Sequence, residues 1–321
     1  MKSIKKIIAL MLVSIMGTFL LTGCGGSRMM FGTGGTAGTY YSYGGVLAQY
    51  MTNYAGVKVT AVSTGASKVN LQSIQDGDFQ LGFTQSDVMA YAWEGTKSFE
   101  KDGGTHDFRV LGGLYDETVQ LITMDENVKS VEDLRGESVS IGAAGSGVYF
   151  NAVDVLEAAG ITLDDIKPQY QSFEDSKEAL KDGKIKAAFI VAGPPTTAIT
   201  ELATTNGVYL INIDGELREK ILASCPYYAS QEIPANTYPG QENPVDTIAV
   251  KATVVVSAYL DDDTVYALTK AIFDHKDEIA VENAKGKELS IDAATEGMAA
   301  PFHKGAARYY EEHGITVNTE E

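Results

Sequence analysis

The chain has 321 residues, of which 44% are hydrophobic and 21% are charged, so its composition is that of a folded globular protein rather than a disordered or fibrous one. Its 43 Asp and Glu residues outnumber its 25 Lys and Arg residues, which gives a formal net charge of −18. This excess of acid argues against a nucleic-acid partner, because binding to a phosphate backbone depends on clustered Lys and Arg side chains. The length favours two domains of roughly 150 residues each.

The first residues have the pattern of a bacterial lipoprotein signal. Three lysines precede an apolar run over residues 7–21, which is shorter than the roughly 20 residues that span a bilayer. The run ends in residues 21–24 (LTGC), which resemble a lipobox, where the signal is cut before the cysteine and its thiol carries the lipid. We therefore expect a signal peptide over residues 1–23, lipidation of Cys24 and a short tether over residues 24–28. The mature protein is then a lipid-anchored protein on the extracytoplasmic face of a cell membrane.

From residue 31 onward, short apolar runs alternate with helical patterns, which is typical of β-α-β units and largely parallel sheets. The predicted strands cover residues 57–63, 79–84, 109–114, 118–124, 139–142, 186–192, 208–213 and 250–257. The predicted helices cover residues 66–75, 86–93, 148–159, 172–182, 197–204 and 264–279. The sequence therefore predicts the α/β fold class.

Polar residues stand where several of these helices begin. Ser86 and Asp87 are a plausible N-cap, and Ser130 and Asp133 have the spacing of a capping box. Three consecutive acids at residues 261–263 precede the last predicted helix. We expect these acids to complement the helix dipole rather than to bind a metal ion.

Residues 31–41 (FGTGGTAGTYY) form a glycine-rich turn between a predicted strand and a helix. Gly32, Gly34 and Ala37 match a variant of the dinucleotide-binding fingerprint, G-x-G-x-x-A. That fold also needs a carboxylate about 20 residues further on to bind the ribose. No Asp or Glu lies within residues 29–75, so a nucleotide ligand is disfavoured.

The acid-free stretch over residues 29–75 favours a different anion, because the N–H groups at a helix N-terminus supply donors and a partial positive charge. A second turn of this kind occurs at residues 141–149 (IGAAGSGVY), so each of two lobes could present a helix N-terminus to one ligand. Tight turns with small residues for packing are the alternative. Polar residues at 63–65, 84–87 and 192–194 fit the same cleft, because ligands of α/β proteins bind beyond the carboxyl ends of strands.

Familiar catalytic motifs are missing from the sequence, including H-E-x-x-H, C-x-x-C, the Walker loop and G-x-S-x-G. The four histidines are far apart and flanked by charged residues, so we expect solvated positions for His106, His275, His303 and His313. Cys225 is expected to be a small buried hydrophobe. No carboxylate stands out as half of an acid/base pair, and no metal or cofactor site is expected. Binding without turnover is therefore favoured over an enzyme.

Several blocks along the chain resemble one known family. These blocks are residues 32–41 (GTGGTAGTYY), 63–67 (STGAS), 85–88 (QSDV), 133–136 (DLRG), 145–147 (GSG), 233–241 (IPANTYPGQ) and 301–311 (PFHKGAARYYE). With matches in the same order between residues 31 and 315, the chain resembles the TAXI-type solute-binding subunits of tripartite ATP-independent periplasmic (TRAP) transporters.

The resemblance implies a two-lobed periplasmic-binding-protein fold of a type II-like kind. Residues 29–120 and 252–321 would form lobe 1 and residues 121–251 lobe 2, with a hinge near residues 121–124 and 249–253. The implied function is that of a receptor, not an enzyme, which binds a small organic anion such as glutamate or a related dicarboxylate in the cleft between the lobes. The receptor would deliver this solute to the membrane permease subunits of a TRAP transporter.

The resemblance also implies a set of ligand-binding positions. These are Gly35, Thr36, Thr39, Tyr40, Thr64, Gln85, Ser86, Ser146, Gly147 and Gly193. In the closing block, His303 and Arg308 are expected to be structural. Two other functions stay open from the residues alone: a lipid-anchored surface hydrolase, and a sensor input module that signals to a membrane partner.

Overall fold

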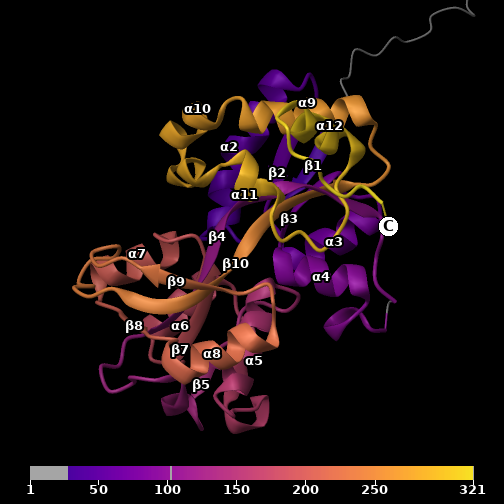
Figure 1. Cartoon of the computed structure of the whole chain (residues 1–321). Coiled ribbons are helices and arrows are strands. Elements are labelled where there is room, and N and C mark those ends of the chain that lie inside the picture. Colours follow the sequence, from indigo (N-terminus) through magenta and orange to yellow (C-terminus); the bar gives the residue numbers. More distant parts are fainter. Residues whose placement is uncertain (1–27, 102, 321) are drawn as a thin grey trace, which may run out of the picture.

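The computed structural model describes residues 28–101 and 103–320, which form two lobes of mixed α/β structure (Figure 1). The expected signal peptide and Cys24 lie outside the described residues, so the lipid anchor stays a prediction. Within the described ranges, no helix is both long enough and apolar enough to cross a bilayer.

The first lobe combines the N-terminal and C-terminal parts of the chain (Figure 1). Its own strands are β1 (Arg28–Gly32), β2 (Lys58–Val62) and β3 (Leu81–Gln85). Its helices are α2 (Thr39–Tyr54), α3 (Ser67–Gln75), α4 (Ser86–Glu94), α9 (Asp262–Phe273), α10 (Lys276–Glu282), α11 (Ile291–Thr295) and α12 (Lys304–Glu312), with short 3-10 turns η1 (Lys97–Phe99) and η4 (Ala284–Glu288). β1 lies between β2 and β3 and is parallel to both, as the β-α-β pattern predicts.

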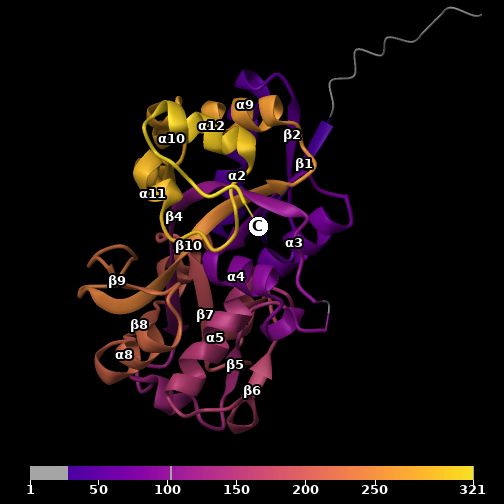
Figure 2. The same cartoon turned by 45° about the vertical axis from the view of Figure 1, so that its right-hand side comes forward.

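The second lobe is formed by the middle of the chain (Figure 2). Its own strands are β5 (Ser138–Ser140), β6 (Lys167–Gln169), β7 (Ala187–Ala192), β8 (Tyr209–Ile211) and β9 (Ala229–Ile233). Its helices are α5 (Gly147–Ala158), α6 (Phe173–Lys181), α7 (Thr197–Thr205) and α8 (Gly215–Ser224), with 3-10 turns η2 (Val131–Leu134) and η3 (Leu163–Asp165). β5 is parallel to β6 and to β7.

Two long antiparallel strands, β4 (Phe108–Thr123) and β10 (Val245–Ser257), run through both lobes and join their sheets (Figures 1 and 2). The strand order is β2-β1-β3-β10-β4-β7-β5-β6, with β8 beside β4 and β9 beside β10. The predicted lobe limits fall inside these two strands and stay a prediction. Residues 121–123 of β4 pair with β7 on one side and β8 on the other, so this part of the predicted hinge lies within the sheet of the second lobe.

The prediction of two separate strands at residues 109–114 and 118–124 is wrong, because both belong to β4. Tyr115, Asp116 and Glu117 interrupt the apolar pattern, but they stay extended because β10 supplies their backbone partners from the far end of the chain. A distant strand therefore overrides the local pattern.

The predicted helix over residues 264–279 is likewise two helices, α9 and α10. The chain leaves helical geometry at His275, whose ring stacks on Tyr54 of α2 with 3.7 Å between the ring centroids. The apolar positions of both helices continue one sequence rhythm, so the pattern alone did not show the break. The cap predicted before this segment is confirmed, since the Asp261 carboxylate accepts a hydrogen bond from the Thr264 backbone N–H.

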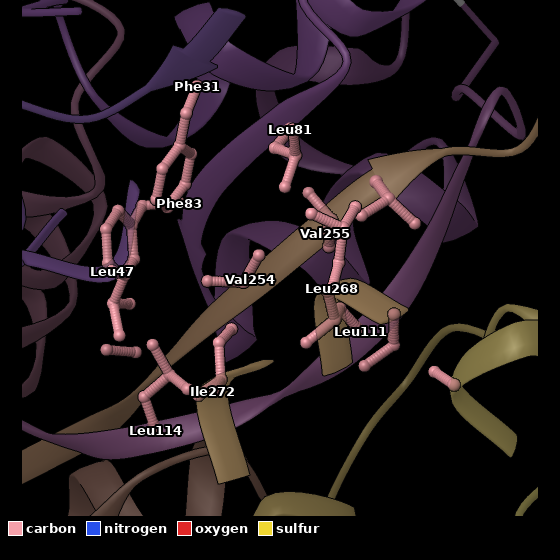
Figure 3. Packing of buried hydrophobic residues seen from close by; sticks show 14 of the residues in the cluster. Phe31, Leu47, Leu81, Phe83, Leu111, Leu114, Val254, Val255, Leu268 and Ile272 are labelled. Carbon is pink, nitrogen blue, oxygen red and sulfur yellow. The ribbon is translucent and has the colours of Figure 1, made fainter. Parts of the chain in front are cut away.

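The core of the first lobe packs α2 and α9 against its sheet (Figure 3). Among the labelled side chains, the strands contribute Phe31, Leu81, Phe83, Val254 and Val255. The two helices contribute Leu47, Leu268 and Ile272. Each large apolar side chain that is fully buried contributes about 1.5–3 kcal/mol. This packing holds the sheet, and with it the strand ends that face the second lobe.

In the second lobe, β7 is buried on both faces. Phe189 and Val191 pack on one side of the sheet with Leu156 of α5, while Ala188 and Ile190 pack on the other side with α6 and α7. This alternation follows from the two-residue period of a strand. A central strand covered on both faces is typical of α/β sheets.

Candidate ligand-binding cleft

A cavity lies between the lobes, where α2, β3 and β4 meet α5, α6 and β7, and its volume with its opening to solvent is about 590 Å³. Seven of the predicted binding residues line it: Gly35, Thr39, Tyr40, Thr64, Gln85, Ser146 and Gly147. The other lining residues are Gly34, Gly38, Gly65, Ala66, Ser67, Glu117, Ala143, Val148, Gln171, Ser172, Phe173, Val191 and Ala192. The fold thus brings residues from both lobes to one site.

Both glycine-rich turns end at this cavity. The first leads into α2 after Gly38, and the second leads into α5 after Ser146. Neither helix start has a hydrogen bond from a capping side chain. Because the first N–H groups of a helix have no partner within the helix, each lobe presents donors and a partial positive charge to the cavity.

Asn70 of α3 holds the first turn in place. Its side-chain amide donates hydrogen bonds to the carbonyl oxygens of Gly32 (3.2 Å), Thr33 (2.7 Å) and Phe83 (2.8 Å), while its own oxygen accepts one from Thr64 (2.7 Å). A Cβ on Gly32 would lie 2.4 Å from that Asn70 oxygen, so a larger residue does not fit. One buried amide therefore fixes the ends of β1 and β3 beside the cavity.

The two lobes contact each other across the cavity. The Thr39 hydroxyl donates a hydrogen bond to the carbonyl oxygen of Gly193 (3.0 Å), and the Lys68 backbone N–H donates one to the carbonyl oxygen of Gly145 (3.1 Å). Thr39 and Lys68 belong to the first lobe, and both acceptors belong to the second. The structure therefore shows a closed cleft.

Glu117 of β4 is a lining residue that sequence analysis missed, and only 3% of it is exposed. Its carboxylate accepts hydrogen bonds from the hydroxyls of Tyr40 (2.8 Å) and Tyr115 (3.4 Å). Burial raises the pKa of Glu117 from 4.5 to about 8, although hydrogen bonds from Tyr40 and Gln85 oppose the shift. The sequence signal for it is an acid inside an apolar run, a pattern that by itself predicts a break between two strands.

Gln85, at the end of β3, lies beside Glu117 and is also buried. Its side-chain Oε1 has no hydrogen-bond partner among the described residues. A Cβ on Gly147 would lie 1.8 Å from this oxygen, so Gln85 occupies the space that the glycine at the start of α5 leaves open. A free buried acceptor next to a buried carboxylate is a place for a ligand that donates hydrogen bonds.

The sequence matches the NMT1-like family over residues 31–314, which is most of the chain. The chain belongs to the NMT1-like family. Among solved structures, this NMT1-like protein is similar to the binding protein of a phosphonate ABC transporter from Pseudomonas aeruginosa, with a TM-score of 0.55 and 12% identity over 83% of this chain and 80% of that one.

Two further structures share the fold. The alkanesulfonate-binding protein SsuA from Xanthomonas axonopodis pv. citri, bound to MOPS, has a TM-score of 0.50 and 18% identity over 91% of this chain and 86% of that one. A putative L-cystine ABC transporter protein from Listeria monocytogenes has a TM-score of 0.50 and 14% identity over 84% of this chain and 98% of that one. These similarities confirm the predicted two-lobed periplasmic-binding-protein fold.

Three predicted binding residues of the NMT1-like protein lie outside the cavity lining. Thr36 is exposed in the first glycine-rich turn. The Ser86 hydroxyl accepts a hydrogen bond from the Lys251 backbone N–H (3.1 Å), and Gly193 packs so closely on Lys285 that a Cβ would lie 2.4 Å from its Cε. Ser86 and Gly193 are therefore engaged within the protein, and a role in ligand binding stays a prediction for all ten residues.

The N-cap predicted at Ser86 and Asp87 is placed one residue too late, because the N-cap of α4 is Gln85. Asp87 instead lies fully buried in the first turn of α4, where burial raises its pKa from 3.8 to about 7. Its carboxylate accepts a hydrogen bond from Asn151 of α5 (2.9 Å). The same Asn151 amide also donates to the hydroxyl of Tyr228 (2.8 Å), so a buried polar cluster joins the lobes.

Two further residues that the sequence analysis discussed, Cys225 and His303, make contacts within the protein. Cys225 is buried, as predicted, with its Sγ 3.6 Å from the Tyr91 hydroxyl. His303 is also buried, so its predicted solvated position is wrong; its ring bonds the Leu260 carbonyl oxygen and accepts from the Gly305 N–H, which caps α12. In the part of the chain that the structure describes, no group of His, Cys, Asp and Glu residues is arranged to hold a metal ion.

Proposed function

We propose that this NMT1-like protein is an extracytoplasmic solute receptor that captures a small organic anion between its lobes and delivers it to a membrane transporter. One observation carries the proposal: the uncapped N-termini of α2 and α5, from different lobes, meet at one cavity. Two proteins with the same fold are named as binding proteins for alkanesulfonates and phosphonates, which are small anions.

Closure of the lobes is the proposed mechanism. An anion that bridges the two helix N-termini would stabilise the closed arrangement, in which Thr39 bonds Gly193. The ligand shifts the equilibrium only by as much as it binds the closed state more tightly than the open one. The transporter would then recognise the closed receptor. In this proposal, the ligand-contacting residues are the ten that the resemblance implies, together with Glu117.

The finer proposal follows from the resemblance to TAXI-type receptors. In it, the solute is glutamate or a related dicarboxylate, the partner is a TRAP permease, and Cys24 anchors the receptor to the membrane. Two of the neighbours of known structure are named as parts of ABC transporters, so the transporter class needs its own test. Solute uptake by membrane vesicles that continues without ATP supports a TRAP partner, and uptake that requires ATP supports an ABC partner.

The central test identifies the ligand. Native mass spectrometry of the purified protein identifies any solute that co-purifies. Calorimetric titrations with glutamate, 2-oxoglutarate and succinate measure the affinity for each. Binding of a small anion, with the anion recovered unchanged after release, is the expected result. Recovery of a chemically altered solute would overturn the receptor in favour of the surface hydrolase. If no small anion binds, the proposal that the cavity binds an anion is wrong.

A further inference from the structure

The second feature of the cavity, besides the helix N-termini, is a buried acid without a cationic partner. Glu117 lines the cavity and is 3% exposed, and its hydrogen-bond partners are neutral: the hydroxyls of Tyr40 and Tyr115 and the side chain of Gln85. No Lys, Arg or His within the described ranges forms an ion pair with it. Since an isolated buried carboxylate is costly, a charged Glu117 requires a cation that the protein itself does not provide.

Two lysines on elements that neighbour β4 are already engaged. Lys285 of η4 forms an ion pair with Glu288 (2.5 Å) and lies over the ring of Tyr115, 5.5 Å from its centroid. Lys251 of β10 forms an ion pair with Asp116 (2.9 Å), the neighbour of Glu117 on β4. A cation for Glu117 must therefore come from the cavity.

Gln85 adds a second acceptor at the same place. Its Oε1 is buried and has no hydrogen-bond partner among the described residues, and the residue lines the cavity with Glu117. The helix N-termini of α2 and α5 offer the opposite polarity, N–H donors for an anion. One cavity thus contains an acceptor pair and a donor pair.

We infer that the solute carries an ammonium group as well as a carboxylate, and that Glu117 and Gln85 bind its N–H donors while the helix N-termini bind the carboxylate. The ligand class is then an amino acid or a similar zwitterion, rather than a dicarboxylate without an amine. This inference rests on the proposed receptor function. It makes Glu117 a specificity-determining residue.

Binding of such a solute is coupled to a proton. In the closed arrangement, where burial raises its pKa to about 8, Glu117 is largely protonated at pH 7 as long as the cleft holds no ligand. A ligand ammonium favours the carboxylate, so the proton leaves Glu117 for the buffer as the ion pair forms. The groups that face Glu117 from the elements around it are Tyr40 of α2, Tyr115 of β4 and Asp87 of α4, with the Lys285–Glu288 and Lys251–Asp116 pairs beyond them.

The test compares amino acids with carboxylic acids that lack the amine, and L-glutamate with glutarate is the pair that differs only in the amine. L-Glutamate is titrated against glutarate, and the other L-amino acids against succinate and 2-oxoglutarate, at pH 7 in two buffers of different ionisation enthalpy. We expect an amino acid to bind at least about 10-fold more tightly than its amine-free analogue, since hydrogen bonds to charged groups contribute about 1.5–3 kcal/mol. The buffer dependence should show release of up to one proton per ligand.

Glu117→Gln is the matched variant, because the amide keeps the shape and one acceptor oxygen, which can accept from either Tyr40 or Tyr115, since these two hydroxyls donate to different oxygens of Glu117. It should weaken amino-acid binding about 10- to 100-fold and abolish proton release. Asp116→Asn, one residue away and paired with Lys251 outside the cavity lining, is the control and should change neither value.

The failures are distinguishable. Binding of amine-free dicarboxylates with equal or greater affinity overturns the inference and leaves the receptor intact. Amino-acid binding that Glu117→Gln does not weaken overturns the role of Glu117. Absence of heat from every solute of both sets overturns the proposed anion receptor itself, and the inference with it.

Discussion

Asn151 of the second lobe donates a hydrogen bond of 2.9 Å to the carboxylate of Asp87 in the first lobe, and both side chains are fully buried. Asp87 lies in the first turn of α4, the helix that follows β3. Asn151 lies in the second turn of α5, the helix that follows the second glycine-rich turn. Their bond exists only when the lobes are together. It is therefore a structural element of the closed state, separate from the ligand.

Asn151→Ala should weaken ligand binding by about 10-fold or more, because closure would then leave the Asp87 carboxylate without this donor. Calorimetry measures the affinity, and small-angle scattering measures the compactness of the ligand-saturated protein. Asn206→Ala, at the exposed end of α7, is the control. Unchanged affinity together with unchanged compactness would show that the Asp87 contact does not contribute to closure.

Gly147→Ala should block closure. The added methyl group would lie 1.8 Å from the Gln85 Oε1, so either Gln85 must leave its buried place or the lobes must stay apart. We expect at least a 10-fold loss of affinity with little change in the folding of either lobe. Gly45→Ala in α2 is the control, because a Cβ there meets nothing within 4 Å. Equal affinities of the two variants would contradict the prediction.

Glu117 should make the ligand-free protein less stable as the pH rises. Between its usual pKa of 4.5 and its raised value of about 8, the folded protein holds a proton that the unfolded chain has released. The free energy of unfolding therefore falls with rising pH in that window. Glu117→Gln should reduce this slope by up to about 1.4 kcal/mol per pH unit. Asp87, with a pKa raised to about 7, contributes a slope of the same sign, which the variant keeps.

Urea unfolding at pH 5, 6, 7 and 7.5 without ligand measures these slopes. Asp116→Asn serves as the control and should keep the slope of the unmodified protein. If Glu117→Gln has that slope too, Glu117 is ionised in the folded protein throughout the range.

Cys24→Ala should release the protein from the membrane, since Cys24 is the predicted site of lipidation. Partition into the detergent phase of a Triton X-114 extract measures the anchor. Cys225→Ala removes the other, buried thiol and should leave the partition unchanged. Detergent partition of the Cys24 variant would contradict a lipid anchor at this residue.

Local patterns were enough for much of the fold. The β-α-β rhythm predicted the α/β class, and the Ser130–Asp133 capping box is present as predicted. Patterns were less reliable where a distant segment decides the local structure. Residues 115–117 stay in β4 because β10 pairs with them, and α9 ends where His275 stacks on Tyr54.

The binding site divides in the same way. The sequence by itself determined the glycine-rich turns and the helix starts after them, because backbone donors at a helix N-terminus depend only on local structure. Only the tertiary structure placed Glu117 in the cavity, bonded to Tyr40 at a separation of 77 residues. The charge of an acid in a strand is read directly from the sequence. Whether that acid faces water, a lysine or a ligand depends on which segments pack around it, and this packing is not a local property.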